Sequence, residues 1–417
     1  MQVKLPYGHQ ELNVQLPRER VEVLLPRTPP RLASEETAFR QAVRCPMESK
    51  SLMSLAEGVH SVCIVISDWT RPTPNHLLVP WLINEMSLCS RPPHHITILV
   101  AAGTHEPPAG AVPFSWWHAL PPHVDVLIHD AREESRLVNV GRTNLGDIRL
   151  HEAYVQAQLR VVTGFIEPHF FAGFSGGAKA VLPGIAALDN ILRLHGPEFI
   201  AHRCNTWFAR DKNPTHEAIV AAARLCPPHF LVNVTLDRAH HITGFFSGDW
   251  AEAHRAGCEF CARYSSVDRT RKYPVVLTTN GGYPLDQNLY QTVKGMSAAS
   301  RIAAPGGDIV IASACEAGIP SAGNFKHLLL SHDSLEALVL ASRCQPAVLD
   351  QWEAQAMAAV LSNHRVHLYS QLAPETVRDC FVHPVTDLSC TIIRLLDEHG
   401  PDAHMAVMPL GPLAVPH

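Results

Sequence analysis

Short runs of Val, Ile, Leu and Ala punctuate the pattern of polar and apolar positions along the chain. The clearest runs occupy residues 61–67, 96–101, 161–166, 275–279 and 308–314, and each leads into glycine or polar residues. Continuous apolar runs of this length are typical of strands that are buried on both faces of a sheet. The pattern therefore predicts strands at the centre of mostly parallel sheets.

Between these runs, apolar positions recur with the three- to four-residue spacing of a helix that buries one face. This spacing predicts helices over residues 75–88, 186–194, 250–264 and 335–340. Strands that alternate with helices along a chain indicate the α/β class. We expect two α/β domains with mostly parallel sheets and an active-site cleft between them.

A charged stretch at residues 268–273 separates the third of these helices from the next buried strand, so it predicts a domain boundary. We expect an N-terminal catalytic and cofactor-binding domain over residues 1–267. A smaller C-terminal α/β domain is expected over residues 274–400. The tail at 401–417, which is rich in Pro and Ala, is a candidate for packing back on the N-terminal domain.

Composition narrows the class of protein. The 417 residues are 46% hydrophobic and 18% charged, which is ordinary for an enzyme, and the net charge of −5 offers no electrostatic footprint for nucleic acid. Neither a transmembrane run nor a signal-peptide core stands out, and the 11 cysteines lack disulfide-like spacing. We therefore expect a cytoplasmic protein with no nucleic-acid or membrane partner.

The loop that follows the strand at 161–166 carries the strongest chemical signal. It reads Glu-Pro-His-Phe-Phe-Ala-Gly-Phe-Ser-Gly-Gly-Ala-Lys over residues 167–179. Glycines let the backbone approach a ligand closely, and a lysine in such a loop is placed to hold one. The loop departs from a Walker A sequence, because Ala178 and Ala180 replace the second glycine and the hydroxyl residue.

Other predicted strand ends also deliver polar residues, and ligands of α/β sheets bind outside the carboxyl ends of strands. His105 and His169 follow separate strands, so the pair is suited to acid and base roles on a substrate. Arg71 and Lys294 offer cations for a carboxylate or phosphate. Loop caps for the histidines and ion pairs for the cations remain alternatives. The residues themselves indicate a cleft that binds an anionic ligand.

The set of motifs, taken in order over most of the chain, resembles the nickel-dependent lactate racemase family, which uses a nickel-pincer nucleotide. The motifs are Asp68-x-x-Arg71-x-Thr73-Pro74, Gly103-Thr104-His105, the His169 to Lys179 loop with Leu182-Pro183-Gly184, His195, Asn213-Pro214-x-His216-Glu217, Gly248-Asp249, Tyr290-Gln291-x-x-Lys294, and Ser297-Ala298-Ala299 leading to Pro305-Gly306-Gly307.

The resemblance implies a role for each aligned residue. The cofactor is pyridinium-3-thioamide-5-thiocarboxylic acid mononucleotide carrying nickel, attached covalently to Lys179, with His195 as a metal ligand. His105 and His169 are the implied acid/base pair. Asp68, Thr73, Gly176 and Gly177 are implied to help hold the cofactor, the two glycines by donating backbone amides. The implied substrate-binding residues are Arg71, Tyr290, Gln291, Lys294 and Trp352.

The implied reaction is racemisation or epimerisation of a 2-hydroxy acid, by reversible hydride transfer from Cα to the cofactor. The expected partners are this small acid and the enzymes that make the cofactor. Three alternatives stay open: an epimerase of a sugar acid or a larger 2-hydroxy acid, a non-catalytic carrier of the nucleotide, and a zinc or nickel hydrolase. The sequence does not choose the substrate.

Overall fold

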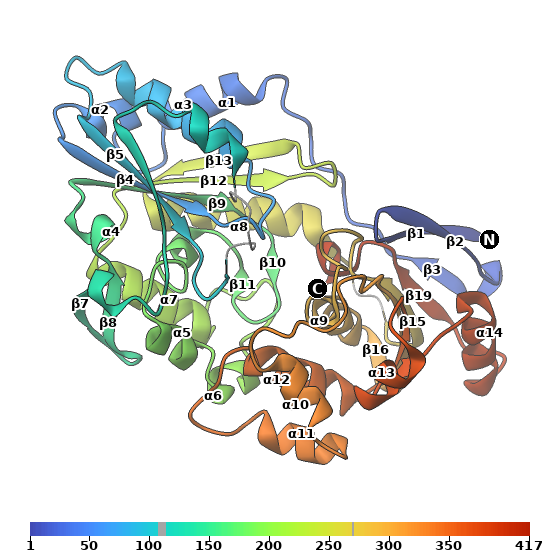
Figure 1. Cartoon of the computed structure of the whole chain (residues 1–417). Helices are drawn as coiled ribbons and strands as arrows, with labels where there is room; N and C mark the ends of the chain where they lie inside the picture. The colour runs from blue at the N-terminus through green and yellow to red at the C-terminus, as the bar shows by residue number, and fades with distance from the viewer. Residues whose placement is uncertain (107–113, 269–270) are drawn as a thin grey trace. The chain divides into compact units, whose positions relative to one another are not determined.

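The computed structural model describes residues 1–106, 114–268 and 271–417, and the chain forms two compact units. The N-terminal unit comprises Thr28–Leu194 and Cys204–Arg263. The C-terminal unit comprises Met1–Arg27, His195–Arg203 and Tyr264–His417. Each unit is built on its own six-stranded sheet, which confirms the predicted α/β class (Figure 1).

The sheet of the N-terminal unit is parallel except at one edge, where β12 and β13 run antiparallel. Its central strands are almost wholly buried, as the continuous apolar runs predict. The strand order is β13 (Ile242–Gly248), β12 (Phe230–Leu236), β9 (Leu159–Phe165), β4 (Ser61–Ser67), β5 (His95–Ala101) and β6 (Val124–Ile128).

Helices cover both faces of this sheet (Figure 1). On one face α1, α2 and α3 pack on β4, β5, β9 and β12 through a cluster that includes Phe39, Leu82 and Ile64. On the other lie α7 and α8. The helices and small elements are α1 (Glu35–Arg44), α2 (Leu52–Ala56), α3 (Asn75–Ser87), α4 (Glu152–Gln156), β7 (Leu137–Thr143), β8 (Gly146–His151), β10 (Pro168–His169), β11 (Gly173–Phe174), η4 (Gly177–Ala180), α5 (Leu188–Leu194), α7 (Pro214–Leu225) and α8 (Trp250–Ser265).

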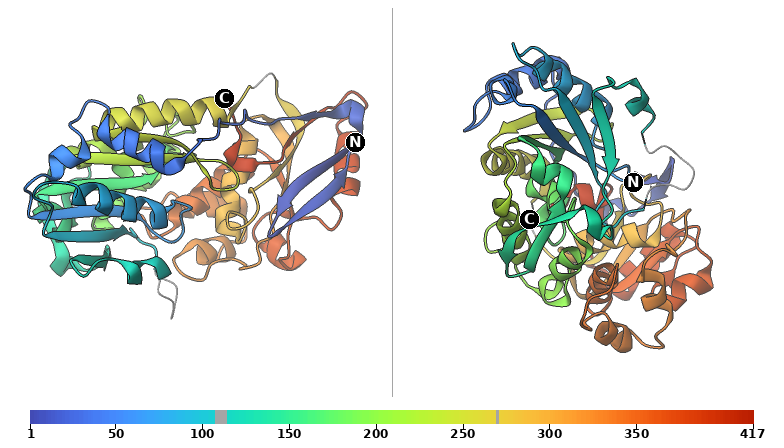
Figure 2. Two further views of the ribbon diagram at one scale, coloured as in Figure 1. Left: turned by 90° about the horizontal axis from the view of Figure 1, so that it is seen from above. Right: turned by 60° about the vertical axis from the view of Figure 1, so that its left-hand side comes forward.

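The sheet of the C-terminal unit is parallel throughout. Its order is β18 (His383–Pro384), β17 (Arg365–Tyr369), β16 (Ala303–Ala312), β15 (Tyr273–Thr279), β19 (Met405–Met408) and β3 (Val21–Val23). One face is covered by α14 (Leu388–Glu398) and by the hairpin of β1 (Gln2–Tyr7) and β2 (Gln10–Gln15), which is dark blue in Figure 2. The other elements used below are α6 (Pro197–Ala201), α9 (Leu289–Ser300) and α12 (Gln351–Leu361).

The predicted elements are present, and their ends differ where tertiary pairing extends or shortens them. The run at 61–67 is β4 with the same bounds. The run at 308–314 is β16, which begins earlier, at Ala303, because Ala303 pairs with Tyr273 ahead of a register shift. No helix in the described part of the chain is both long enough and apolar enough to cross a bilayer.

The compact units differ from the predicted domain limits at the start of the chain, at His195–Arg203, which lies in the C-terminal unit, and at the tail. The first 27 residues lie in the C-terminal unit, because β3 pairs with β19 there. The tail also belongs to this unit, since β19 pairs with β15 and β20 (Val415–Pro416) pairs with β14 (Ser266–Val267). In the predicted boundary segment, residues 269–270 lie outside the described residues.

Candidate active site

Asp68 and His105 meet at the carboxyl ends of two neighbouring strands. β4 and β5 pair in parallel, with Ser67 opposite Ala101, so the segments that follow them leave the sheet side by side. His105 Nδ1 lies 2.8 Å from Asp68 Oδ2. The other carboxylate oxygen accepts hydrogen bonds from the backbone N–H and the hydroxyl of Thr70, at 2.7 and 2.5 Å. The aspartate is therefore held on both oxygens.

The Asp68 carboxylate fixes which nitrogen of the neutral His105 ring carries the proton. Burial opposes its charge, but the hydrogen bond and charge of His105 and the charge of Arg71 outweigh burial and lower the pKa of Asp68 to about 2. An ionised carboxylate only accepts hydrogen bonds, so Nδ1 of His105 carries a proton, and in the neutral ring Nε2 is left with a lone pair. The His105 side chain is 42% exposed. It can therefore act as a base toward a ligand.

The His169 ring is held in the opposite tautomer, with Nδ1 as an acceptor. It lies on β10, where its Nδ1 accepts hydrogen bonds from the backbone N–H groups of Phe171 and Ala172, at 3.5 and 3.3 Å. Its ring stacks on Phe170 and meets Phe171 edge-on, with centroids 5.2 and 4.4 Å apart. An accepting nitrogen bears no proton, so the neutral ring carries its proton on Nε2. Both contacts are long, and they are weak.

The glycine loop packs against β12 and α8, and the amide of Gly177 is engaged there. The N–H of Gly177 donates to Asn233 Oδ1 at 2.7 Å, so this amide has a partner within the protein, and its cofactor role stays a prediction. Gly177 has a φ of +58°, and a Cβ there would lie 2.6 Å from the His254 ring. Glycine is therefore required for both backbone conformation and close packing.

Two other implied cofactor ligands also have internal partners. The Thr73 hydroxyl is buried and donates to Ser67 Oγ at 3.0 Å. Asp68 is engaged by His105 and Thr70. The direct functions that the structure supports for these residues are to fix the loop after β4 and to orient His105. Arg71 lies in the same turn, half-buried, with its backbone N–H donating to the Asp68 carbonyl.

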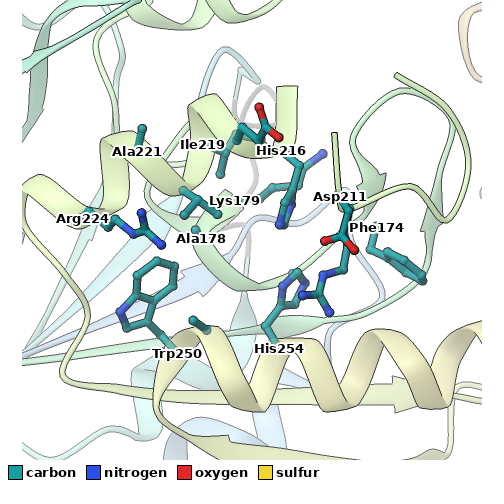
Figure 3. A pocket seen from close by; sticks show the side chains of 15 residues that line it. Phe174, Ala178, Lys179, Asp211, His216, Ile219, Ala221, Arg224, Trp250 and His254 are labelled. Carbon is teal, nitrogen blue, oxygen red and sulfur yellow. The ribbon is translucent and has the colours of Figure 1, made fainter. Parts of the chain in front are cut away.

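Lys179 lines a cavity of about 310 Å³ in the N-terminal unit. Figure 3 shows the side chains around this space between α7 and α8. Asn213 links α7 to the glycine loop. Its side chain caps α7 by accepting a hydrogen bond from the His216 N–H, and it also donates to the Phe171 carbonyl. The lining includes Phe174, Gly176, Ala178, Lys179, Arg210, Asp211, His216, Glu217, Arg224, Trp250 and His254.

Both histidines of the cavity are neutral at physiological pH. Burial, reinforced by the positive charges of Arg210 and Lys179, lowers the pKa of His216 to about 4. Burial also lowers the pKa of His254 to about 4, although its Nε2–H donates to the Ser175 carbonyl at 2.9 Å. The charged groups of the cavity are therefore its lysine, two arginines and two carboxylates.

The remaining predicted residues lie in the C-terminal unit. The His195 ring contacts the Trp352 ring, with centroids 4.5 Å apart. Trp352 Nε1 donates to the Tyr290 hydroxyl at 3.0 Å, which links α12 to α9. One turn further along α9, Lys294 Nζ donates to Gln291 Oε1 at 2.7 Å. Thus His195 and Trp352 form one contact group, which extends to Tyr290, and Gln291 and Lys294 form another.

Several residues of these sites were not predicted from the sequence. Asn233, Arg210, Trp250 and His254 carry no local signal, because their positions depend on how β12, α7 and α8 fold around the loop. His216 could have been found, since it belongs to the Asn-Pro-x-His-Glu motif.

Glu353, next to Trp352, is another residue of the site that the sequence does not predict. It is buried with Oε1 lacking a hydrogen-bond partner, and burial raises its pKa to about 8, against the opposing effect of Lys294. A protonated Glu353 would leave the positive charge of Lys294 available to an anion. Among the described residues, no group of three or more His, Cys, Asp or Glu is arranged to hold a metal ion.

Comparisons with known proteins match both parts of the chain. Residues 7–207 match the family model "Lactate racemase N-terminal domain", and residues 269–415 match "Lactate racemase C-terminal domain". The chain is 35% identical over 394 residues to the lactate racemase of Thermoanaerobacterium thermosaccharolyticum, covering 93% of this chain and 92% of the relative. It is also 35% identical over 387 residues to the lactate racemase of Lactiplantibacillus plantarum, covering 91% and 90%.

Solved structures show the same similarity. The lactate racemase apoprotein from T. thermosaccharolyticum superposes with a TM-score of 0.93 and 33% identity, over 100% of both chains. A protein from Thermotoga maritima shares the fold, with a TM-score of 0.64 at 17% identity over 88% of this chain and 96% of that one.

Proposed function

Because the chain belongs to the lactate racemase family, a family of isomerases, we propose that it racemises or epimerises a 2-hydroxy acid of the lactate type. The observation that carries this proposal is the Asp68–His105 pair at the carboxyl ends of β4 and β5. A histidine oriented by a buried carboxylate is a base whose free nitrogen is ready to accept a proton.

The two predicted acid/base histidines begin in different states, which suits a substrate that arrives as either enantiomer. His105 Nε2 accepts the hydroxyl proton of one enantiomer, while Nε2–H of His169 donates a hydrogen bond to a substrate oxygen. For the opposite enantiomer, His169 is the base. In that role its ring carries the proton on Nδ1, which replaces the hydrogen bonds from the Phe171 and Ala172 N–H groups.

Cationic and polar groups would hold the substrate. Arg71 and Lys294 are assigned to the carboxylate, since charge-assisted hydrogen bonds orient an anion strongly. Gln291 orients Lys294 by accepting its hydrogen bond. Tyr290 and Trp352, which hydrogen-bond to each other, would form an aromatic wall beside the substrate.

The nickel-pincer nucleotide fits the residues present. Lys179 is assigned as its covalent attachment point, because it lines a cavity with cationic and aromatic side chains. His195, a buried imidazole against Trp352, is assigned as the nickel ligand. When bound, this group supplies a pyridinium ring that accepts and returns a hydride. The side chains of the protein bind and orient the substrate, and its two histidines exchange the hydroxyl proton.

The same chemistry on a sugar acid or a larger 2-hydroxy acid is the second candidate. Phe170 and Phe171 around His169 favour an apolar group beside that histidine, and so favour lactate or an aryl 2-hydroxy acid over a sugar acid. A non-catalytic carrier of the nucleotide would have no need for a carboxylate-oriented histidine at an exposed position.

The proposal is tested by producing the protein with cofactor-making enzymes and nickel, and then incubating it with single enantiomers of lactate, aryl 2-hydroxy acids and sugar acids. We expect one acid to racemise or epimerise, with an intact-mass increase and bound nickel in the same sample. Lys179→Ala should lose the mass increase, and His195→Ala should lose nickel.

Outcomes of this experiment separate the candidates. Turnover of a sugar acid alone would favour the second candidate over lactate. A mass increase without turnover of any acid, in protein that binds nickel fully, would favour the carrier. Neither adduct nor nickel, while the T. thermosaccharolyticum enzyme loads normally under the same conditions, would contradict the assigned cofactor.

A further inference from the structure

The start of α12 brings two acidic residues, Asp350 and Glu353, against α9 within the C-terminal unit. Asp350 is the N-cap residue of α12, and its carboxylate hydrogen-bonds to the Tyr290 hydroxyl. The same hydroxyl accepts the indole N–H of Trp352 at 3.0 Å. The negative charge of Asp350 acts on both Tyr290 and Glu353, so the two acidic residues influence each other.

Glu353 is buried without the hydrogen bonds that an ionised carboxylate needs. Its side chain is 2% exposed, and Oε1 has no hydrogen-bond partner among the described residues. Such surroundings remove the hydration of a carboxylate and favour its protonated form. Burial raises the pKa of Glu353 to about 8, the charge of Asp350 adds to this shift, and the charge of Lys294 opposes it. Glu353 is therefore a neutral acid at pH 7.

The charged groups that act on Glu353 come from α9 and from the N-cap of α12. Lys294 and Tyr290 lie on α9, and Asp350 is the N-cap residue. The helices α6, α10 (Phe325–Leu330) and α11 (Leu335–Ala341) also pack on α12 (Figure 1). Their titratable residues do not contribute to the shifted pKa of Glu353, and these residues are Glu198, Lys326, His327 and Glu336. Lys294 is thus the cation that ionisation of Glu353 would affect.

Lys294 is assigned to the substrate carboxylate in the proposed function, and Gln291 orients it. The substrate carboxylate and an ionised Glu353 would compete for one ammonium group, because pairing with either neutralises the charge offered to the other. We infer that Glu353 is a positioning residue that stays neutral while substrate is bound and, once ionised, draws Lys294 away from the substrate carboxylate. Substrate affinity then falls as pH rises above neutrality. The inference rests on the proposed function, because that function assigns Lys294 to the carboxylate.

The pH dependence of KM in the loaded enzyme tests the inference. Wild type and Glu353→Gln are loaded with nickel and cofactor at one pH, exchanged into a pH series, and assayed with lactate or with the acid that the protein turns over in its place. Wild-type KM should rise about tenfold over the two pH units centred near pH 8, with a smaller change in kcat. The carboxamide of Glu353→Gln cannot ionise, so its KM should change by less than about twofold. Nickel content at each pH shows that the cofactor is retained.

Unfolding of the cofactor-free protein reports the same ionisation without any substrate. The pKa of Glu353 is raised from 4.5 to about 8, so between these pH values the folded protein holds a proton that the unfolded chain has lost. The resulting stability is fully present below pH 4.5 and is lost as pH rises through 8. The urea midpoint of wild type should therefore fall relative to that of Glu353→Gln as pH rises from 4.5 to 8, and the difference should stay level above pH 8.

Two further variants separate the role of Glu353 from general effects of charge or folding. Glu336→Gln makes the same substitution at an exposed position of α11, and it should follow wild type in both measurements. Asp350→Asn removes a charge that raises the pKa of Glu353, so the step in KM should move to lower pH. This variant tests the inference if Glu353→Gln does not fold.

An equal rise of KM in wild type and Glu353→Gln would overturn the inference. So would a difference in urea midpoint that stays constant between pH 4.5 and 8. A pH effect on kcat alone would also overturn it, because Lys294 would then have kept its hold on the substrate. Failure of the proposed function has a different signature. Fully loaded protein would then turn over none of the acids at any pH, which removes the substrate step of the inference, while the urea midpoints still report the proton on Glu353.

Discussion

Asp68 in the N-terminal unit and Asp308 in the C-terminal unit are both buried carboxylates that hydrogen-bond to histidines. Asp308 binds His367 Nε2 and His399 Nε2, each at 2.7 Å, and Arg365 at 2.6 Å. Burial opposes its charge, but these three hydrogen bonds lower its pKa to about 2, as for Asp68. In local chemistry the two sites are similar.

Their positions in the sheets differ. Asp68 follows the carboxyl end of β4, whereas Asp308 lies where the main parallel pairing of β16 begins, opposite Val275 and Arg365. His105 is 42% exposed, but His367 is 7% exposed and is enclosed with Asp308. Because ligands bind outside the carboxyl ends of parallel strands, the first pair is suited to chemistry and the second to stability. A buried Asp–His pair alone does not identify an active site.

Replacing the histidines gives the largest expected contrast. His105→Ala should lower kcat by about 10³-fold or more, because it removes a proton acceptor, while bound nickel and the unfolding midpoint stay near wild type. His367→Ala should keep kcat and lower the midpoint in denaturant. Racemisation rates, nickel content and unfolding curves check both. Loss of activity in folded His367→Ala would show that the strand-end argument is wrong.

Replacing the aspartates sharpens the comparison. Asp68→Asn should lower kcat by roughly 10²-fold, since an amide holds the His105 tautomer less firmly than a carboxylate. Asp308→Asn leaves Arg365 and two histidines without their anion, and should lower the free energy of unfolding by about 3 kcal/mol with kcat unchanged. Equal kcat in Asp68→Asn and wild type would contradict the role assigned to Asp68.

The smallest expected effect is on the free energy of unfolding at acidic pH, where the two sites should behave alike. The pKa of each aspartate is lowered from 3.8 to about 2, so each contributes stability that is present above pH 3.8 and is lost as pH falls through 2. Each contribution is of the order of 2 kcal/mol. The difference in unfolding free energy between wild type and Asp308→Asn should therefore shrink by about 2 kcal/mol between pH 4 and 2. A constant difference over that range would contradict the lowered pKa of Asp308.

Local pattern predicted the central strands and several helices well. β4 was located to the residue, and α8 extends the predicted helix by one residue, because buried apolar runs and helical periodicity are properties of the local sequence. The start of β16 was missed, since Ala303 joins the strand only through its partner Tyr273. The placement of β3 beside β19 depends on pairing across almost the whole chain.

For the candidate site, the order of residues along the chain specifies which chemical groups are present: two histidines after strands, a lysine in a glycine loop, and the motifs of the lactate racemase family. Which atoms of these groups are engaged depends on how distant segments fold together. The folded structure gave Asp68 to His105, the Gly177 amide to Asn233, and the Thr73 hydroxyl to Ser67. It also placed Arg210 and two histidines beside Lys179. Residue type limits which hydrogen bonds and charges are available, but their partners come from distant strands and helices, and no local pattern encodes those distances.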